Sequence, residues 1–381
     1  MLGINSNINS LVAQENLSGS QSALSQAITR LSSGKRINNA SDDAAGLAIS
    51  TRMQTQINGL NQGVSNANNG VSMIQTASSA LSSLTSSLQR IRQLAVQAST
   101  GALSSSDQAA LQKEVSAQIS EVNRIASQTT FNGTNILDGS AGSISFQVGA
   151  NVGQTVSLNL SQSMSAAKIG GGLVQTGATV GTVAVSLDST GVYTSAASPA
   201  ITSVNVLSDG KGGYTFTDQN NQAIAATVAA AIFSTGTQAG TGTAITTLAL
   251  SAGALSPGAA SAAQTAAVAQ INAINAPPTV SGLDISTVTG ANQAMVSVDN
   301  ALQTVNNLQA SLGAAQNRFT AIATSQQAES TDLSSAQSQI TDANFAQETA
   351  NLSKAQVLQQ AGISVLAQAN SNPQQVLKLL Q

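Results

Sequence analysis

The side chains able to do chemistry in this sequence are carboxylates, amines, guanidinium groups, amides and hydroxyls, because histidine and cysteine are both absent. Their absence excludes a Ser-His-Asp triad, a cysteine nucleophile and a zinc site built from cysteine or histidine. It also excludes disulfide bonds, so cysteine pairing says nothing about the redox compartment. We therefore expect no catalytic residue, no metal site and no cofactor, in a protein that is not an enzyme.

One glycine run, Gly170–Gly172, has the composition of a phosphate-binding loop. Such a loop lies between a strand and a helix, and it ends in Lys-Ser or Lys-Thr, whose side chains contact the phosphates and Mg²⁺. The run has neither this context nor this ending. We interpret it as a linker.

Charged side chains gather near the N-terminus, where Lys35-Arg36 is followed by Asp42-Asp43. They either lie in a solvated turn or lock neighbouring segments in register. Residues 1–100 hold six Lys or Arg and three acidic residues, whereas residues 283–381 hold three and six. Opposite charge at the two ends favours their pairing. A net charge of −3 gives no sign of nucleic-acid binding.

The composition suits burial against copies of the same chain. Only 8% of the residues are charged and 2% aromatic, whereas about 25% of an ordinary soluble protein is charged. Amides and hydroxyls dominate the polar residues, and they desolvate at less cost than charges. No apolar run is long enough to span a membrane, and residues 1–10 lack the basic and apolar regions of a signal peptide. We expect no membrane insertion.

Long helices are the elements expected to position these side chains. From Met53 to Ala98, apolar residues recur at alternating steps of four and three, which predicts one helix with a single apolar stripe. The average step of 3.5 residues suits packing against another long helix. The C-terminal hundred residues supply one, with apolar residues at sevens from Val298 to Phe319.

Both ends of the chain carry narrower apolar stripes, flanked by Ser, Gln and Asn. The stripes consist of Ile4, Leu11, Leu17, Leu24, Leu31, Leu352, Leu358 and Leu366. An isolated helix with so thin a stripe is marginal in water. We expect both ends to be flexible in the free chain and to become helical when copies pack together.

Shorter signals divide the rest of the chain. An N-cap at Ser41 or Asp42 is expected to begin the long helix, and Ser105 with Gln108 to begin a third helix. Alternation of period two predicts a hairpin from residues 144–148 and 156–160. From Lys168 the composition changes, and short alternating runs predict a mostly β insertion with one helix over residues 259–274. The expected fold class is mainly α: a long antiparallel helical rod formed by both chain ends, a small β-hairpin, and an inserted mostly-β (α+β) outer domain.

Four segments of the sequence resemble bacterial flagellin, the filament subunit of the flagellum. They are MLGINSNINSLVAQENL, LSSGKRINNASDDAAGLAISTRM, QRIRQLAVQASTG and TDANFAQETANLSKAQVLQQAGISVLAQANSNPQQVLKLL. The resemblance extends over residues 1–165 and 283–381. The insertion, residues 168–282, shows no resemblance that we can name. It implies that both ends form a coiled coil lining a narrow channel, that the middle helices build an outer tube, and that the insertion faces solvent.

The resemblance also implies a domain division and a function. Residues 1–43 and 336–381 form the inner coiled-coil domain, residues 44–167 and 283–335 the helical rod domain with its hairpin, and residues 168–282 the variable outer domain. The chain polymerises into the extracellular filament for swimming motility, after type III export without cleavage of a signal peptide. Its implied partners are further copies, an export chaperone, and the cap and hook-junction proteins. Two alternatives stay open: a hook-filament junction protein, and an adhesin carried by the insertion.

Recognition by an innate immune receptor is a further implication. In this family the vertebrate receptor TLR5 reads a surface whose matching residues here are Arg90, Leu94 and Glu114. Arg90 and Leu94 are four residues apart, and we expect them to share an exposed edge of the helix. The plainer interpretation is that they only contact other subunits, and both roles are compatible.

The C-terminus carries a second implied immune signal. Leu377, Leu379 and Leu380 match the leucine motif that intracellular NAIP receptors sense in this family. The motif usually ends in arginine, and here the terminal residue is Gln381.

Overall fold

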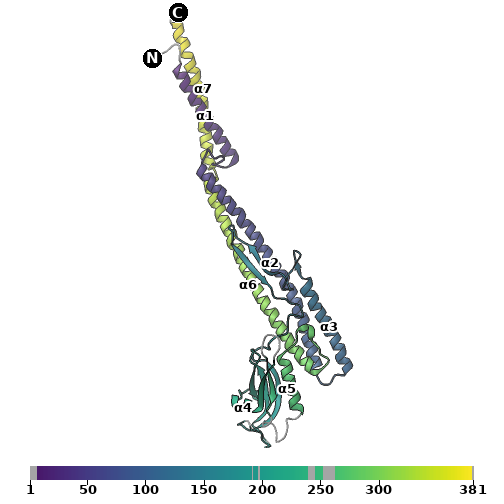
Figure 1. Cartoon of the computed structure of the whole chain (residues 1–381). Coiled ribbons are helices and arrows are strands. Elements are labelled where there is room, and N and C mark those ends of the chain that lie inside the picture. Colours follow the sequence, from purple (N-terminus) through teal and green to yellow (C-terminus); the bar gives the residue numbers. More distant parts are fainter. Residues whose placement is uncertain (1–6, 191, 196–197, 239–244, 252–261, 380–381) are drawn as a thin grey trace. The chain divides into compact units, whose positions relative to one another are not determined.

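The computed structural model describes residues 7–190, 192–195, 198–238, 245–251 and 262–379 (Figure 1). Its helices are α1 (Ile8–Ser33), α2 (Ala44–Ala98), α3 (Ser105–Gln128), α4 (Ala226–Ile232), α5 (Ala262–Asn275), α6 (Val288–Thr341) and α7 (Phe345–Leu379), with one 3-10 turn, η1 (Val280–Gly282). Its strands are β1 (Thr130–Phe131), β2 (Thr134–Asn135), β3 (Gly142–Gln147), β4 (Thr155–Leu160), β5 (Thr179–Leu187), β6 (Ile201–Ser208), β7 (Tyr214–Asp218), β8 (Phe233–Gln238) and β9 (Ile245–Leu250). The predicted fold class, mainly helical with a small hairpin and a β-rich middle domain, is confirmed.

The chain forms two compact units. Unit 1 consists of Met1–Ala67, Gln147–Thr155 and Ala321–Gln381. Unit 2 consists of Asn68–Phe146 and Val156–Thr320. Helices α2 and α6 contribute residues to both units.

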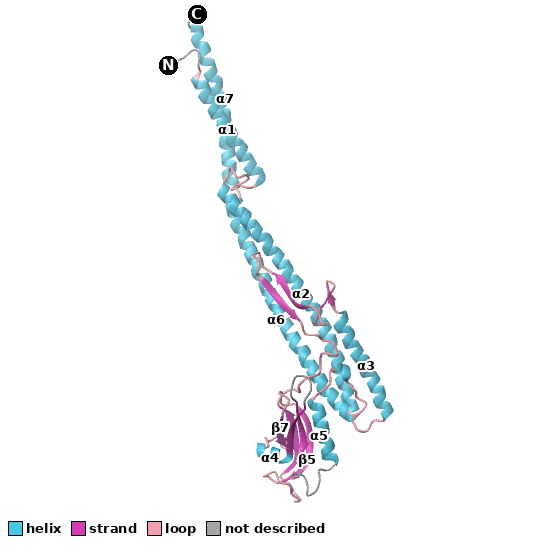
Figure 2. Cartoon of the chain, in the orientation of Figure 1, coloured by secondary structure: helices cyan, strands magenta, loops and turns pink. Residues whose placement is uncertain are grey.

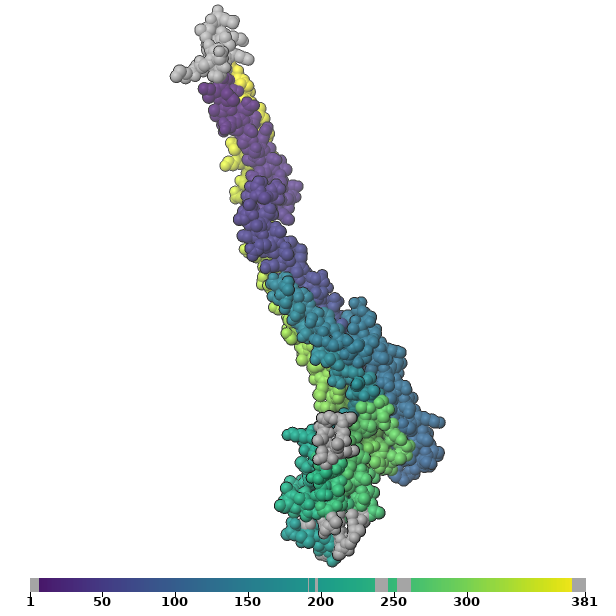
Figure 3. Space-filling model, in the orientation of Figure 1, coloured from purple at the N-terminus to yellow at the C-terminus, as the bar shows by residue number. Residues whose placement is uncertain are grey.

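In unit 1, α1 and α7 lie side by side and antiparallel, purple beside yellow in Figure 3. The Asn7 side-chain amide donates a hydrogen bond to the carbonyl oxygen of Ala369 at 2.8 Å, and Leu17 lies beside Gly362. The buried apolar side chains described on this pair are Ala13, Ala27, Ala355 and Ala369. Alanine lets the two helices approach closely, but it removes little apolar area from water.

The cap residues differ by one or two positions from those predicted. Helix α2 begins at Ala44, and its cap is Asp43, which accepts a hydrogen bond from the Gly46 N–H at 2.9 Å. The prediction of Ser41 or Asp42 is wrong, because the Asp42 carboxylate binds backbone N–H groups of the preceding turn instead. Helix α3 is capped by Ser104 rather than Ser105.

In unit 2, the predicted apolar stripe forms the core of a helical bundle. The fully buried side chains on α2 and α6 are Ile74, Ala77, Leu81, Leu84, Leu88, Ile91, Ala95, Val298, Val305, Leu312 and Phe319. The two helices run antiparallel, since Gly70 packs on Phe319 while Arg92 pairs with Asp299 at 2.7 Å. Val115 and Val122 of α3 add to the buried residues of this unit.

The hairpin loop between β3 and β4 belongs to unit 1 and lies directly on α2. The Asn66 side-chain amide donates a hydrogen bond to the carbonyl oxygen of Gln147 at 2.8 Å. A Cβ atom on Gly63 would collide with the carbonyl oxygen of Val148, and it would lie 2.8 Å from Oε1 of Gln326. Glycine at position 63 is what allows the loop to approach the helix backbone.

The insertion is mostly β, as predicted (Figure 2). Strands β5, β6 and β7 form an antiparallel sheet, β8 pairs with β9, and α5 packs on β5 and β9. The predicted turn over residues 209–213 joins β6 to β7, and Asp209 accepts hydrogen bonds from the N–H groups of Lys211 and Gly213. The predicted helix over residues 259–274 is α5, and the first three of those residues lie outside the described ranges.

Candidate functional site

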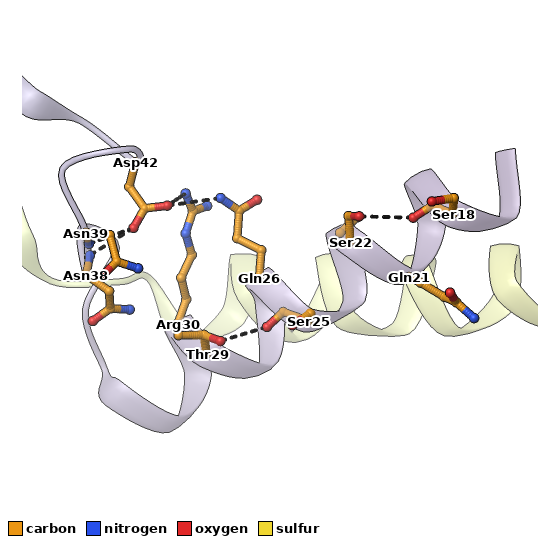
Figure 4. A pocket seen from close by; sticks show the side chains of 11 residues that line it. Ser18, Gln21, Ser22, Ser25, Gln26, Thr29, Arg30, Asn38, Asn39 and Asp42 are labelled. Atoms are coloured by element: carbon orange, nitrogen blue, oxygen red, sulfur yellow. Dashed lines mark hydrogen bonds and ion pairs between the residues drawn. The ribbon is translucent and has the colours of Figure 1, made fainter. Parts of the chain in front are cut away.

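An open groove lies in unit 1, along one face of α1 (Figure 4). Its volume is about 740 Å³. The lining residues are Ser18, Gln21, Ser22, Ala23, Ser25, Gln26, Thr29, Arg30, Asn38, Asn39 and Asp42. Hydroxyl and amide side chains dominate the lining. The charged groups lie at one end, where α1 meets the connector between α1 and α2.

Asp42 organises this connector. One carboxylate oxygen accepts hydrogen bonds from the N–H groups of Asn38 and Asn39, at 3.1 and 3.0 Å. The other accepts from the Gln26 amide at 3.2 Å and lies 4.0 Å from the Arg30 guanidinium. The hydrogen bonds from Asn39, Asn38 and Gln26, aided by the charge of Arg30, lower the pKa of Asp42 below its ordinary value.

Arg30 links the connector to α7. Its guanidinium lies 3.5 Å from the carboxylate of Glu348, which is in the first turn of α7 and almost completely buried. One cation thus faces two carboxylates from two different elements. Neither Arg30 nor Glu348 stands out as a site residue in the sequence. The sequence shows only that Arg30 is near the end of the N-terminal apolar stripe and that Glu348 is near the start of the C-terminal one.

Backbone hydrogen bonds join the same connector to the junction of α6 and α7. The Arg36 N–H donates to the carbonyl oxygen of Thr341 at 2.7 Å, and the Ala343 N–H donates to that of Gly34 at 2.9 Å. The Arg36 guanidinium adds a bond to the carbonyl oxygen of Ile340 at 2.7 Å. Of the two interpretations of these charges, the contacts of Arg36 and Asp42 favour the one in which they hold neighbouring segments in register, whereas Asp43 caps α2.

Apolar side chains remain exposed on both helices of the α1–α7 pair. The described ones are Ile8, Leu11, Val12, Ile28, Phe345, Val357, Leu358, Ile363 and Val365. Among the predicted stripe residues, Leu11 and Leu358 are exposed by 63% and 47%. The half-buried ones are Leu17, Leu24, Leu31, Leu352 and Leu366. Ile4 lies outside the described residues. The pair therefore leaves much of its apolar surface in water.

The three residues matched to the receptor surface do not share one exposed edge. In unit 2, the Arg90 guanidinium of α2 donates two hydrogen bonds to one carboxylate oxygen of Glu114 of α3, at 2.6 and 2.8 Å. Both side chains are exposed. Leu94 is only 1% exposed, so its predicted exposure is wrong. Leu94 is three residues after Ile91 and four before Ala98, both of which are buried, so it lies on the apolar face of α2.

The C-terminal leucines lie at or beyond the limit of the described structure. Helix α7 includes Leu377 and Leu379, whose side chains are not described, and Leu380 lies outside the described residues.

Groups for acid-base or metal chemistry are not assembled in the part of the chain that the structure describes. It contains no group of three or more carboxylates arranged to hold a metal ion. Burial raises the pKa of Tyr214 to about 12, so this phenol stays protonated at neutral pH. None of the described helices is long and apolar enough to cross a membrane.

Three family models match this chain. The bacterial flagellin N-terminal helical region matches residues 4–142, the flagellin D2 domain residues 172–276, and the bacterial flagellin C-terminal helical region residues 295–380. The D2 match gives the insertion a relative that the resemblance in the sequence does not name.

Whole-chain comparisons agree with these matches. Flagellin B of Vibrio cholerae serotype O1 is 37% identical over 393 residues, which span 100% of this chain and 99% of that protein. The structure of FliC from Burkholderia pseudomallei is 67% identical with a TM-score of 0.59, and it covers 65% of this chain and 99% of its own. The flagellar junction protein FlgL from Legionella pneumophila is 16% identical with a TM-score of 0.39, covering 77% of this chain and 100% of its own. That likeness carries no argument for the junction-protein alternative.

The matches thus extend from one end of the chain to the other and include the insertion. Flagellins are structural proteins of the extracellular flagellar filament and not enzymes. The long helix pairs and the full-length matches lead to one conclusion: the chain belongs to the bacterial flagellin family and is a structural subunit of the filament.

Proposed function

We propose that copies of this chain polymerise through the exposed apolar faces of α1 and α7. The observation that carries the proposal is the exposure of large apolar side chains on a helix pair whose buried apolar residues, among those described, are all alanines. Val357 and Leu11 are exposed by 65% and 63%. Burying such a side chain against another copy stabilises the contact by about 1.5–3 kcal/mol.

The polar groups around these faces favour the same partner. The groove along α1 is lined mainly by hydroxyls and amides, which lose less on desolvation than charges would. Neighbouring copies can therefore cover the α1–α7 pair while burying few charged groups. Burial of this kind also supplies the free energy that orders the two chain ends.

Matched substitutions test this proposal. Val357→Asn replaces an exposed valine of α7, and Val192→Asn replaces an equally accessible one of the insertion, exposed by 61%. We expect both variants to fold like the parent chain by circular dichroism. After salt-induced assembly, sedimentation and negative-stain microscopy should show filaments for the parent and Val192→Asn, and few for Val357→Asn. Equal assembly of the two variants would contradict the proposal.

We further propose the family's division of the chain, with the inner coiled-coil domain at 1–43 and 336–381 and the outer domain at 168–282 facing solvent. The D2 match over residues 172–276 supports the outer boundaries. Export through the flagellar type III apparatus without signal-peptide cleavage, and contacts with an export chaperone and with the cap and hook-junction proteins, belong to this proposal. The adhesin alternative concerns the outer domain alone.

We also infer that the free subunit is recognised by TLR5 through the exposed pair of Arg90 and Glu114. Their ion pair bridges α2 and α3 at the surface, where it contributes little to stability, typically about 0–1 kcal/mol. Leu94 is buried and is not part of the proposed receptor surface. The leucines Leu377, Leu379 and Leu380 remain the proposed elements for sensing by NAIP receptors.

Charge reversal tests the receptor proposal. Arg90→Glu and Glu114→Arg should each lower activation of TLR5 in reporter cells while shifting the free energy of unfolding by less than about 1 kcal/mol. Arg124→Glu is the control, because Arg124 lies on α3 in a similarly exposed pair with Glu121. Unchanged signalling by the Arg90 and Glu114 variants would limit these residues to a packing role.

A further inference from the structure

Asn132 and Gly133 form the two-residue turn between β1 and β2 in unit 2. The flanking residues Phe131 and Thr134 pair with each other. Asn132 and Gly133 have positive φ angles, 49° and 79°, as a two-residue hairpin turn of type I′ requires. Both residues are exposed to solvent.

We propose that Asn132 is a site of spontaneous deamidation, a covalent modification whose only co-reactant is water. The backbone nitrogen of Gly133 loses its proton and attacks the side-chain Cγ of Asn132. The new C–N bond closes a five-membered succinimide ring, and the side-chain nitrogen leaves as ammonia. Water then opens the ring at either carbonyl and yields aspartate or isoaspartate. One amide and one water thus become one carboxylic acid and one ammonia, without any oxidant or reductant.

The local structure leaves the attacking nitrogen accessible. Gly133 has no side chain to shield its amide, and none of the described hydrogen bonds uses its N–H. The sheet that closes the turn consists of two residue pairs, followed by one further hydrogen bond from the Ile136 N–H to the carbonyl oxygen of Thr129 at 3.1 Å. A hairpin this short opens at low cost, and opening frees the backbone rotation that the attack needs.

The chain contains its own controls, because Asn-Gly occurs three times in the sequence. Asn58-Gly59 and Asn69-Gly70 both lie in the interior of α2. There each glycine N–H is held by the carbonyl four residues earlier, and the helical backbone keeps the asparagine side chain away from it. The same Asn-Gly dipeptide thus occurs once in a hairpin turn and twice in the interior of a helix.

The products would alter the end of α3. A new carboxylate at position 132 stands four residues after Gln128, near the negative end of that helix, where a negative charge is unfavourable. Isoaspartate also adds a backbone atom to the turn, which breaks the register between β1 and β2. The chain would gain one negative charge beyond its net −3.

Peptide mapping of the full-length protein tests the proposal. Trypsin cleavage at Arg124 and Lys168 yields a peptide with Asn132, and cleavage at Arg52 and Arg90 yields one with both helical controls. During incubation at 37 °C we expect the mass change of amide-to-acid conversion at Asn132, faster at higher pH because hydroxide generates the attacking anion. The rate should exceed that of the helical sites by about tenfold or more. Equal rates at all three sites, or an unmodified Asn132, would overturn the proposal.

Two variants identify the product. Asn132→Gln should lose both the mass change and the isoaspartate detected by an isoaspartyl methyltransferase, because its side chain can close only a slower six-membered ring. Asn69→Gln should retain both signals in full. Isoaspartate persisting in Asn132→Gln would assign the reaction to another residue and contradict the proposal.

Discussion

The Asp42 carboxylate stabilises the folded connector only while it is ionised. Hydrogen bonds from the Asn39 and Asn38 N–H groups and the Gln26 amide lower its pKa in the folded chain. A carboxyl whose folded pKa lies below its unfolded value of about 3.9 stabilises the fold above that pH. The contribution is lost as the pH falls through the folded pKa.

We therefore predict an acid-dependent effect of Asp42→Asn. At neutral pH the variant should unfold at a lower denaturant concentration than the parent chain, because the amide accepts the backbone hydrogen bonds less well. Chemical unfolding followed by circular dichroism should show this difference shrinking below about pH 4. A difference that stays constant into strong acid would contradict the assignment.

Leu94 and Arg30 show which single-residue environments can be predicted from the sequence and which cannot. Arg90 and Leu94 are four apart, but Leu94 is also three residues after Ile91 of the apolar stripe, and its burial follows from that periodicity. Its position is thus predictable once the stripe is extended by one residue. Arg30 and Glu348 are 318 residues apart, and their 3.5 Å approach depends on how the two ends pair, which local sequence does not specify.

At the scale of elements, the glycines of the long helices differ in how closely they are packed. Gly63 of α2 lies under the carbonyl oxygen of Val148, whereas a Cβ atom on Gly313 of α6 meets nothing within 4 Å. We predict that Gly63→Ala destabilises the chain, since strain of about 1–3 kcal/mol exceeds the helix-propensity gain of about 1 kcal/mol.

The same substitution at Gly313 provides the control. Gly313→Ala should stabilise the chain by up to about 1 kcal/mol, because it only lowers the conformational freedom of the unfolded state. Thermal unfolding measures both effects. Two shifts of the same sign would contradict the close packing of the hairpin loop on α2.

Helices α1 and α7 should differ from α2 in dynamics. Their mutual contact buries only alanines completely among the described apolar residues, which does little to offset an ordering cost of about 1–2 kcal/mol per residue. We predict fast amide hydrogen exchange for residues 8–33 and 345–371 in the free subunit and slow exchange in the filament. The part of α2 from Ile74 to Ala98 should be protected in both. Strong protection of α1 in the free subunit would contradict this prediction.

Helices were easier to predict than their ends. Apolar residues recur every seven positions from Val298 to Phe319. This spacing identifies a buried stripe, because residues seven apart lie on the same face of a helix. Caps were displaced by one or two residues, since Ser104 and Ser105, or Asp42 and Asp43, offer equivalent oxygens. Which oxygen caps the helix depends on tertiary partners that the local sequence does not contain.

At the scale of the whole molecule, the two ends of the insertion lie next to each other. The Val280 N–H donates a hydrogen bond to the carbonyl oxygen of Ile169 at 3.0 Å, and the Ser281 N–H donates to that of Ala166 at 2.9 Å. The chain therefore enters and leaves the insertion at neighbouring points of unit 2, and a short linker can replace the residues between them.

We predict that deletion of residues 171–279, with a short Gly-Ser linker, leaves an assembling protein. Filament formation after salt induction, followed by electron microscopy, is the measurement. Any adhesin activity of the outer domain should be lost in the same variant. A chain that folds by circular dichroism yet never forms filaments would contradict the proposed division.

The pairing of α1 with α7 would make the proposed assembly depend on an intact chain. Asn7 and Ala369 are joined across 362 positions, so α1 finds its partner only when nearly the whole chain is present. A chain cut short before α7, by incomplete synthesis or by proteolysis, has an unpaired α1 and lacks half of the surface on which the next copy would pack. If copies polymerise through α1 and α7 as proposed, such a fragment is expected to be left out of the filament.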